Sequence, residues 1–386
     1  MKQSLKEMLS EQVESVKYRE RHALESLLAS RNSRVVLFGS GGLGKRALMQ
    51  LRGIGIEPLA LSDNKKSLWG TEFGGLMILA PTEAAAQFGT NASFIITIWN
   101  EFHYFNETAE QLRSLGCSQV IPYTYLHWRF PEEFLPCLLN DLPHKVYEDQ
   151  GSVLAAEKLW EDSQSHDIFC ANIRFRAMGE PQDLPPRPVE NTYLPLDILR
   201  PNESERFLDC GATGGEMTQE VLRKYGSNFS EFHAIEADQI SLRKLESYFD
   251  QQPRYIREKL KLYNCAVGGK RGVVRFSNTG ETGSKISDDG VAVDCFPIDE
   301  LFANTSLTYL KMDIEGAEYD TLLGGRMVIQ RDKPVLAICV YHTQNDIWRI
   351  PLLVHEMLPE HKLYLRAYEG DGFQTVLYAV PPERVL

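Results

Sequence analysis

The chain has 386 residues, which is enough for two domains of ordinary size and excludes a single small disulfide-stapled module. It carries 41 Lys and Arg residues against 53 Asp and Glu residues, and the resulting formal net charge of −12 argues against a nucleic-acid partner. A hydrophobic content of 43% is typical of a folded globular protein, and no apolar run is long enough to span a membrane. The charged start of the chain lacks the apolar core of a signal peptide, so we expect a cytoplasmic protein.

The N-terminal region is predicted to form a helix followed by alternating strands and helices. Apolar residues recur every three or four positions over residues 3–30, which predicts one amphipathic helix as a separate N-terminal element at 1–32. Strands and helices then alternate from Arg34 to about residue 125. This alternation predicts a doubly wound parallel sheet, that is, a Rossmann-like nucleotide-binding-type domain at 33–126.

A glycine loop follows the first of these strands and fits the pattern GxGxxG. Gly39, Gly41 and Gly44 would let the backbone approach a pyrophosphate at the start of the next helix. Asp63, at the end of the second strand, is placed to bind a ribose. A nucleotide or nucleotide-sugar is therefore a candidate ligand, although any tight strand-to-helix turn favours glycine. Residues 62–81 also resemble the first Rossmann unit of bacterial sugar-modifying proteins.

The second half of the chain repeats this alternation after a connector. Residues 127–200 are predicted to form a helical connector or cap, and strand–helix alternation restarts in a domain at 201–386. Two apolar runs near the C-terminus, at 362–368 and 375–380, predict an antiparallel hairpin. The expected fold class is thus α/β with two Rossmann-like doubly wound units, the second with the outline of a class I methyltransferase.

A second glycine loop differs from the first in a way that favours an adenosyl cofactor. S-adenosylmethionine presents a carboxylate, an ammonium and a sulfonium in place of a phosphate, so an acidic residue at the head of the loop can bind the ammonium. Glu236, at the end of the following strand, is placed to accept hydrogen bonds from both ribose hydroxyls. The alternative is a second dinucleotide fold in which the acidic residue only caps a turn. The loop residues expected to contact the cofactor are Asp209, Gly211, Ala212 and Gly214.

Several segments of this second half look like the FkbM-type S-adenosylmethionine-dependent methyltransferases. The most specific is YLKMDIEGAEYDTLLGG at 309–325, and the resemblance covers about residues 150–380. It implies a methyltransferase with S-adenosyl-L-methionine as cofactor. Cys210 and Thr213 depart from the family, which usually has small or apolar residues and Asn at these positions.

Ligands of a doubly wound sheet lie beyond the carboxyl ends of its strands, where the loops converge. This rule places Ala266 and Asp313 near the cofactor, and Asp313, Glu315 and His342 at the acceptor as candidate catalytic residues. An aliphatic hydroxyl must lose its proton as it is methylated, and Asp313 is the first candidate to orient or deprotonate it, with His342 second. Glu318 is a further acid expected at the acceptor end. The alternative reading is that a helix begins near Glu315, with Asp313 near its N-cap and Glu315 and Glu318 in its first turn, where carboxylates only stabilise the helix.

Three further features of the second half of the chain could contribute to ligand binding. Tyr193 is a candidate to close over the cofactor, with plain packing as the alternative, and the loop 283–287 is a candidate for acceptor contact. Clustered carboxylates suit Mg²⁺ or Ca²⁺, but no spacing dictates a site, so no metal is assigned.

These observations predict O-methylation of a hydroxyl on a sugar or glycoconjugate by a S-adenosylmethionine-dependent methyltransferase. The expected partners are a small-molecule or glycan acceptor and a nucleotide or nucleotide-sugar in the N-terminal domain, and a homo-oligomer is left open. One alternative acceptor is a lipid, polyketide or peptide hydroxyl. Another alternative is a non-catalytic scaffold that binds the cofactor without turnover. A third, an NAD-dependent oxidoreductase, is disfavoured by the lysines that follow Asp63.

Overall fold

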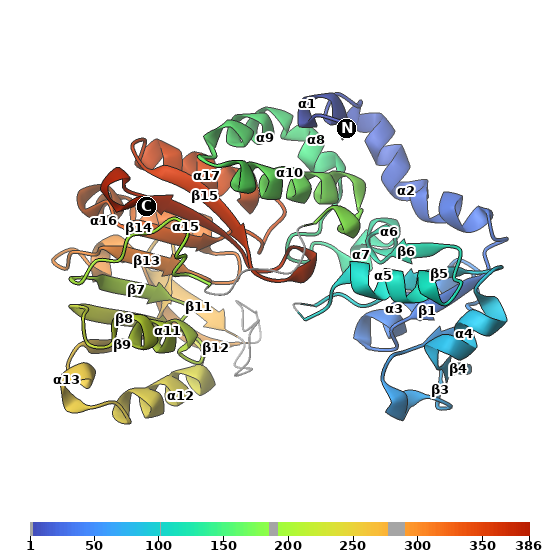
Figure 1. Ribbon diagram of the computed structural model, residues 1–386, viewed down its shortest axis with the longest axis horizontal. Coiled ribbons are helices and arrows are strands. Elements are labelled where there is room, and N and C mark those ends of the chain that lie inside the picture. Colours follow the sequence, from blue (N-terminus) through green and yellow to red (C-terminus); the bar gives the residue numbers. More distant parts are fainter. Residues whose placement is uncertain (1–2, 101, 185–191, 277–289) are drawn as a thin grey trace. The chain divides into compact units, whose positions relative to one another are not determined.

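The computed structural model describes residues 3–100, 102–184, 192–276 and 290–386 (Figure 1). The predicted acceptor-contact loop at 283–287 lies outside these residues. The chain divides into two compact units, and the predicted connector at 127–200 is shared between them. Unit 1 comprises Met1–Leu154, Asp167–Pro188 and Glu369–Phe373, and unit 2 comprises Ala155–His166, Val189–Tyr368 and Gln374–Leu386.

Unit 1 begins with two helices where the sequence predicts one. The predicted helix over 3–30 is interrupted between Met8 and Val13, because the Ser10 hydroxyl donates to the Glu7 carbonyl at 2.6 Å and competes for a helical acceptor. The helices of this part of the chain are α1 (Leu5–Met8), α2 (Val13–Ala29), α3 (Gly42–Gly53), α4 (Pro81–Phe88), α5 (Phe105–Ser114), α6 (Thr124–Arg129), α7 (Pro131–Phe134), α8 (His144–Glu148), α9 (Gln150–Ala156) and α10 (Ser163–Met178).

A six-stranded sheet forms the centre of unit 1. Its order is β3-β4-β2-β1-β5-β6, and every pairing is parallel except that of the short β3 with β4. Val35 and Leu37 of β1 lie in one buried apolar cluster, whereas Val36 and Phe38 lie in another, so both faces of the sheet are covered. The strands are β1 (Val35–Phe38), β2 (Ala60–Ser62), β3 (Glu72–Phe73), β4 (Leu76–Leu79), β5 (Ser93–Ile96) and β6 (Val120–Pro122).

A seven-stranded sheet forms the centre of unit 2, in the order β15-β16-β14-β13-β7-β8-β9. Strand β16 lies antiparallel between β14 and β15, and the other pairings are parallel. The α/β fold class and its terminal antiparallel hairpin are thereby confirmed. The strands are β7 (Arg206–Cys210), β8 (Glu231–Glu236), β9 (Leu260–Asn264), β13 (Tyr309–Met312), β14 (Val335–Cys339), β15 (Lys362–Ala367) and β16 (Thr375–Val380).

Along the chain, helices alternate with the strands of this sheet, and short 3₁₀ turns connect several elements in both units. The helices are α11 (Glu216–Tyr225), α12 (Gln239–Asp250), α13 (Arg254–Arg257), α14 (Ile298–Leu301), α15 (Glu318–Gly324), α16 (Arg326–Asp332) and α17 (Asp346–Met357). The 3₁₀ turns are Lys66–Leu68, Glu157–Leu159, Pro181–Asp183, Gly370–Gly372 and Pro382–Arg384. Among the residues that the structure describes, no helix combines the length and apolar character needed to cross a bilayer.

Three strands of the second half of the chain lie outside the seven-stranded sheet. Strands β10 (Ala266–Val267), β11 (Gly272–Phe276) and β12 (Val291–Phe296) form a separate three-stranded sheet in the order β10-β12-β11. Along β12 buried Val293 and Cys295 alternate with exposed neighbours. A strand that is apolar on one face only does not fit the interior of a parallel sheet that is covered on both faces.

Candidate active site

The carboxyl ends of four adjacent parallel strands, β8, β7, β13 and β14, bring most of the predicted site residues to one edge of the sheet. Asp209 is the penultimate residue of β7 and Glu236 the last of β8, while Asp313 directly follows β13 and His342 follows β14. Parallel strands present their carboxyl ends at the same edge, so residues far apart in sequence converge there.

Gly211 is required by the packing of the loop that follows β7. Its φ is +84°, and a Cβ at this position would lie 2.0 Å from the carbonyl oxygen of Asp313. The backbone N–H of Asp313 also donates to the carbonyl of Cys210 at 3.0 Å. The loop and the start of the Asp313 segment are therefore in direct backbone contact, which only glycine at 211 permits.

The rest of the loop is equally tight. Gly215, with φ +92°, precedes α11, and a Cβ on Gly214 would lie 2.8 Å from Glu216 Oε1. Ala212 is buried. Thr213 adopts a φ of +46°, which a β-branched side chain rarely adopts, and this is one of the two positions where the sequence departs from the FkbM pattern.

A buried ion pair fixes the head of the loop. The register of β13 on β7 sets Lys311 beside Asp209, and Lys311 Nζ lies 2.9 Å from Asp209 Oδ1 and donates to the Gly211 carbonyl at 2.7 Å. Burial raises the pKa of Asp209, and Lys311 only partly opposes this; Asp209 and Asp313 in turn raise the pKa of Lys311 against the effect of burial. Sequence reasoning did not assign this pairing, although a lysine in an otherwise apolar strand is a signal for it.

Glu236 ties the end of β8 to the same loop. Its Oε2 accepts a hydrogen bond from the backbone N–H of Thr213 at 2.7 Å, and its Oε1 accepts one from the N–H of Asp238 at 2.7 Å. Burial raises the pKa of this carboxyl, although the two N–H donors oppose the rise. A carboxylate has about four acceptor positions, so two remain for a ligand. Ala266, at the start of β10, is half-buried.

Asp313 is contacted from two sides. Its Oδ2 accepts a hydrogen bond from the Tyr193 hydroxyl at 2.6 Å, and its Oδ1 lies 3.2 Å from Nε2 of His342. Burial opposes ionisation of this carboxyl, but His342, Lys311 and Tyr193 outweigh it and hold the pKa of Asp313 well below its usual range. Tyr193 is therefore a direct neighbour of the predicted catalytic carboxylate, a contact that sequence reasoning missed.

His342 is oriented by Glu318, an acid that was expected at the acceptor end but not as a partner of His342. His342 Nδ1 lies 2.7 Å from Glu318 Oε1, and the fully buried Glu318 also accepts hydrogen bonds from the N–H groups of Ile314, at 2.8 Å, and Gly316, at 3.0 Å. Burial lowers the pKa of His342, but the carboxylates of Glu318 and Asp313 outweigh this effect and raise it well above the ordinary value. Its surroundings favour a positive charge, so the ordinary histidine pKa suggested by the sequence does not apply.

The loop 313–317 differs from the predicted helix start. Helix α15 begins at Glu318 with Ala317 as its N-cap residue, so Asp313 and Glu315 do not cap it. Glu315 has a φ of +56° and Gly316 a φ of +100°. The chain thus makes a left-handed bend that turns Glu315 Oε2 to 3.9 Å from His342 Nε2.

The N-terminal glycine loop is built on the same plan. A Cβ on Gly44 would lie 1.9 Å from the Gly39 carbonyl, whereas one on Gly41 would meet nothing within 4 Å. Asp63 Oδ2 accepts hydrogen bonds from the N–H of Ser40 at 2.8 Å and from its hydroxyl at 2.6 Å. The two units therefore share one arrangement. In each, a carboxylate at the end of the second strand, Asp63 after β2 or Glu236 in β8, accepts a hydrogen bond from the backbone of the glycine loop that follows the first strand.

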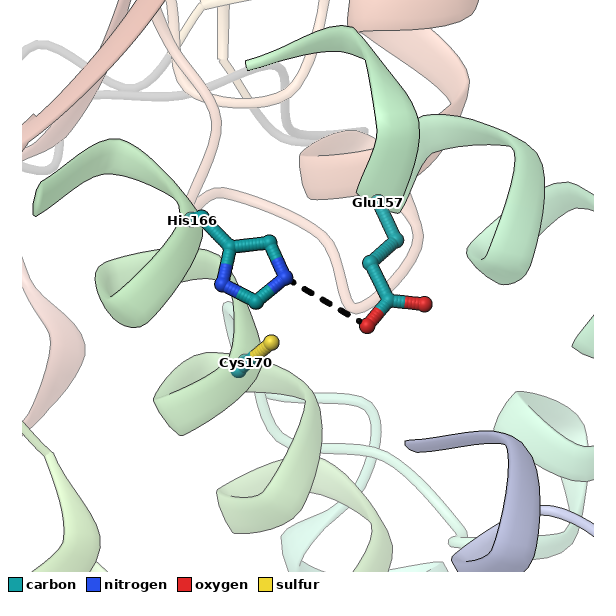
Figure 2. A group of neighbouring side chains, drawn as sticks. All are labelled: Glu157, His166 and Cys170. Atoms are coloured by element: carbon teal, nitrogen blue, oxygen red, sulfur yellow. Dashed lines mark ion pairs between the residues drawn. The ribbon is translucent and has the colours of Figure 1, made fainter. Parts of the chain in front are cut away.

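A further group of potential ligand side chains consists of Glu157, His166 and Cys170 (Figure 2). His166 Nε2 pairs with Glu157 Oε1 at 3.5 Å, and Cys170 lies one turn after His166 on α10. His166 is nearly half exposed, and we assign no function to this group.

Comparisons with known proteins bear on the family and the fold of the chain. Residues 209–369 match the sequence model of the methyltransferase FkbM domain, which confirms the predicted resemblance for that part of the chain. The crystal structure of a methyltransferase FkbM from Methylobacillus flagellatus KT matches with a TM-score of 0.74 and 23% identity, over 95% of this chain and 99% of that one. At this identity the match shows the fold.

Two other solved structures are more distant. They are methyltransferase domains of bacterial CtHen1, with TM-scores of 0.28 and 0.29, 10% identity to each, and coverage of 46% of this chain and 90% and 91% of theirs. No curated protein matches the chain.

Proposed function

Residues 209–369 form a methyltransferase FkbM domain, and from this premise we propose that the protein transfers a methyl group from S-adenosylmethionine to a hydroxyl of a sugar or glycoconjugate. The observation that carries the proposal is the convergence, at one sheet edge, of a glycine loop held by Glu236 with the cluster of Asp313 and His342. The first group fits a methyl donor, and the second fits an acceptor.

The loop residues fit the cofactor. Glu236 retains two acceptor positions for the ribose hydroxyls, and Gly211, Ala212 and Gly214 provide backbone without bulky side chains beside it. Asp209 contributes negative charge for the ammonium, shared with Lys311. When bound, S-adenosylmethionine supplies an electrophilic methyl on a sulfonium that leaves as a neutral thioether.

Asp313 is proposed to orient the acceptor hydroxyl and receive its proton. Its lowered pKa makes it a weak base at rest, but a hydroxyl becomes strongly acidic as its oxygen gains a methyl group, so a weak base in position is sufficient. His342 is proposed to fix the Asp313 carboxylate, and Glu315 to contact the acceptor beside it.

A nucleotide or nucleotide-sugar at Gly39, Gly41 and Gly44 is proposed for unit 1. The open space beside Gly41 supports it, because a ligand can approach the backbone there. The similarity of residues 62–81 to sugar-modifying proteins supports a sugar as the acceptor class.

Isothermal titration with S-adenosylhomocysteine tests the cofactor assignment. We expect the wild type to bind and Glu236→Ala to bind at least about tenfold more weakly, because charged hydrogen bonds to the ribose contribute about 1.5–3 kcal/mol. Glu231→Ala is the matched control, because Glu231 begins the same strand and lies at its opposite end. Failure of the wild type to bind, or equal loss in both variants, contradicts the proposal.

Transfer of a radiolabelled methyl group into a panel of acceptors tests the reaction. Incorporation into a glycan or nucleotide-sugar is expected. Incorporation only into lipid, polyketide or peptide hydroxyls would support a methyltransferase but contradict a sugar or glycoconjugate as its acceptor. Cofactor binding without transfer to any acceptor of the panel would favour a non-catalytic scaffold.

A further inference from the structure

The acceptor end of unit 2 gathers more ligand atoms than an acid–base pair needs. Asp313, Glu318 and His342 each offer one ligand atom, and these atoms lie within 4.8 Å of one another. Glu315 Oε2 lies 3.9 Å from His342 Nε2. Acidic residues often cluster without a cation, so the cluster alone carries no conclusion.

The imidazole of His342 supplies the second observation. The residue is 5% exposed, and its Nδ1 is engaged by Glu318. Its Nε2 is buried and has no hydrogen-bond partner of acceptable geometry among the described residues, although Asp313 Oδ1 lies only 3.2 Å away. A buried ring nitrogen in this position faces two carboxylates without a proper hydrogen bond to either.

The shorter of these two distances matches the separation of two ligands of one cation. Zn²⁺ binds nitrogen and carboxylate oxygen at about 2.0–2.2 Å, which separates two adjacent ligand atoms by roughly 3.0–3.5 Å. The 3.2 Å between His342 Nε2 and Asp313 Oδ1 falls in this range, and a small rotation would bring Glu315 Oε2 into it.

Glu318 behaves as an orienting residue for such a site. Metal-ligating histidines commonly donate their other ring N–H to a carboxylate, which fixes the tautomer and the ring plane. Glu318 is fully buried and is itself fixed by the N–H groups of Ile314 and Gly316. Its carboxylate therefore holds His342 with Nε2 toward Asp313.

We propose that a divalent transition-metal cation displaces the Nε2 proton of His342 to solvent and is bound by His342 Nε2, Asp313 Oδ1 and Glu315 Oε2 beside the acceptor site. One imidazole nitrogen with two carboxylates suits Mn²⁺ or Zn²⁺ better than Mg²⁺ or Ca²⁺, which prefer oxygen ligands alone. Its positive charge would stabilise an acceptor alkoxide, so the role of the cation rests on the proposed function. Binding of the cation does not depend on the proposed function, and it can be measured in the absence of cofactor and acceptor.

Electron paramagnetic resonance with MnCl₂ tests the site on the full chain, without cofactor or acceptor. The signal of free aqueous Mn²⁺ is expected to fall on addition of wild-type protein. Asp313→Asn and His342→Gln should each weaken Mn²⁺ binding by at least about 10–100-fold, which is the loss typical when only an outer-shell partner of a ligand is removed. Controls matched in chemistry are Asp320→Asn, an exposed acid on α15, and His361→Gln, a buried histidine that contacts the Pro334 carbonyl at 3.2 Å.

Each outcome decides the proposal. Mn²⁺ binding that is lost in the two site variants and kept in both controls supports it. Equal binding by wild type and Asp313→Asn, or no binding by the wild type, overturns it. If His342→Gln fails to fold, the comparison of Asp313→Asn with Asp320→Asn still decides. Mn²⁺ binding without S-adenosylhomocysteine binding would instead refute the proposed function and leave the cation site in place.

Discussion

Lys311 Nζ lies 2.9 Å from Asp209 Oδ1 and donates a hydrogen bond to the Gly211 carbonyl at 2.7 Å. One ammonium group on β13 therefore fixes both the Asp209 carboxylate and the turn of the glycine loop. Lys311 is 4% exposed and Asp209 is fully buried. The pair therefore links the strand that leads to Asp313 with the loop proposed to hold the cofactor.

Lys311→Met is expected to destabilise the protein by about 3–5 kcal/mol, because it leaves the Asp209 charge buried without a partner. The double variant Asp209→Asn with Lys311→Met should recover much of this loss, since the Asp209 charge is then removed together with its partner. Denaturant unfolding measures both, with exposed Lys261→Met on β9 as the control. A loss as large in the control, or no recovery in the double variant, contradicts the buried-pair account.

Thr213→Asn is expected to stabilise the protein by about 1 kcal/mol. Thr213 has a φ of +46°, where a β-branched side chain is strained and Asn is tolerated. Cofactor binding should persist, because the contact with Glu236 uses the backbone N–H of residue 213. Thermal unfolding with Thr213→Val, which keeps the β-branch, is the comparison, and an Asn variant no more stable than the Val variant would refute the strain argument.

Local patterns in the sequence predicted the fold and the convergence of the residues that are proposed to hold the cofactor. Strand–helix alternation and glycine spacing are short-range signals, and they placed Gly211 and Glu236 correctly at one sheet edge. The contacts of the acceptor half depend on long-range packing: Tyr193 reaches Asp313 across 120 residues of sequence. No period or motif encodes such a partner.

The shape of the 313–317 loop also depends on long-range contacts. Carboxylates before an apolar run are typical of a helix start, and this local pattern was the basis of the alternative reading, a helix that begins near Glu315. The left-handed residues Glu315 and Gly316 delay the helix until Glu318, whose carboxylate binds the loop amides instead of solvent. Tertiary contacts with His342 outweigh the local preference here.

Substitution of two glycines in unit 1 separates packing from ligand binding. Gly44→Ala should destabilise the unit by more than about 1–3 kcal/mol, because its Cβ would lie 1.9 Å from the Gly39 carbonyl. Gly41→Ala should cost no more than about 1 kcal/mol, since its φ is −71° and a Cβ meets nothing within 4 Å.

Calorimetric unfolding measures both stabilities, and titration with a panel of nucleotide-sugars measures binding. Reduced binding by a stable Gly41→Ala variant is the result expected of an occupied loop. If the wild type binds no nucleotide of the panel, or if Gly41→Ala binds as the wild type does, the loop is glycine-rich for packing alone.

Asp63→Asn is expected to lower the stability of unit 1 in a pH-dependent way. Burial opposes ionisation of Asp63, but hydrogen bonds from the Ser40 hydroxyl and the N–H groups of Ser40 and Lys65 outweigh it and lower its pKa. A lowered folded-state pKa contributes stability above the unfolded pKa of about 3.9, and that contribution is lost as pH falls through the folded value. The gap between wild type and Asp63→Asn should therefore be full near neutrality and should close below about pH 4. Differential scanning calorimetry across pH measures the gap, and Ser40→Ala, which removes one donor, should make it smaller. A gap that is constant across pH would mean that Asp63 acts through packing and not through its charge.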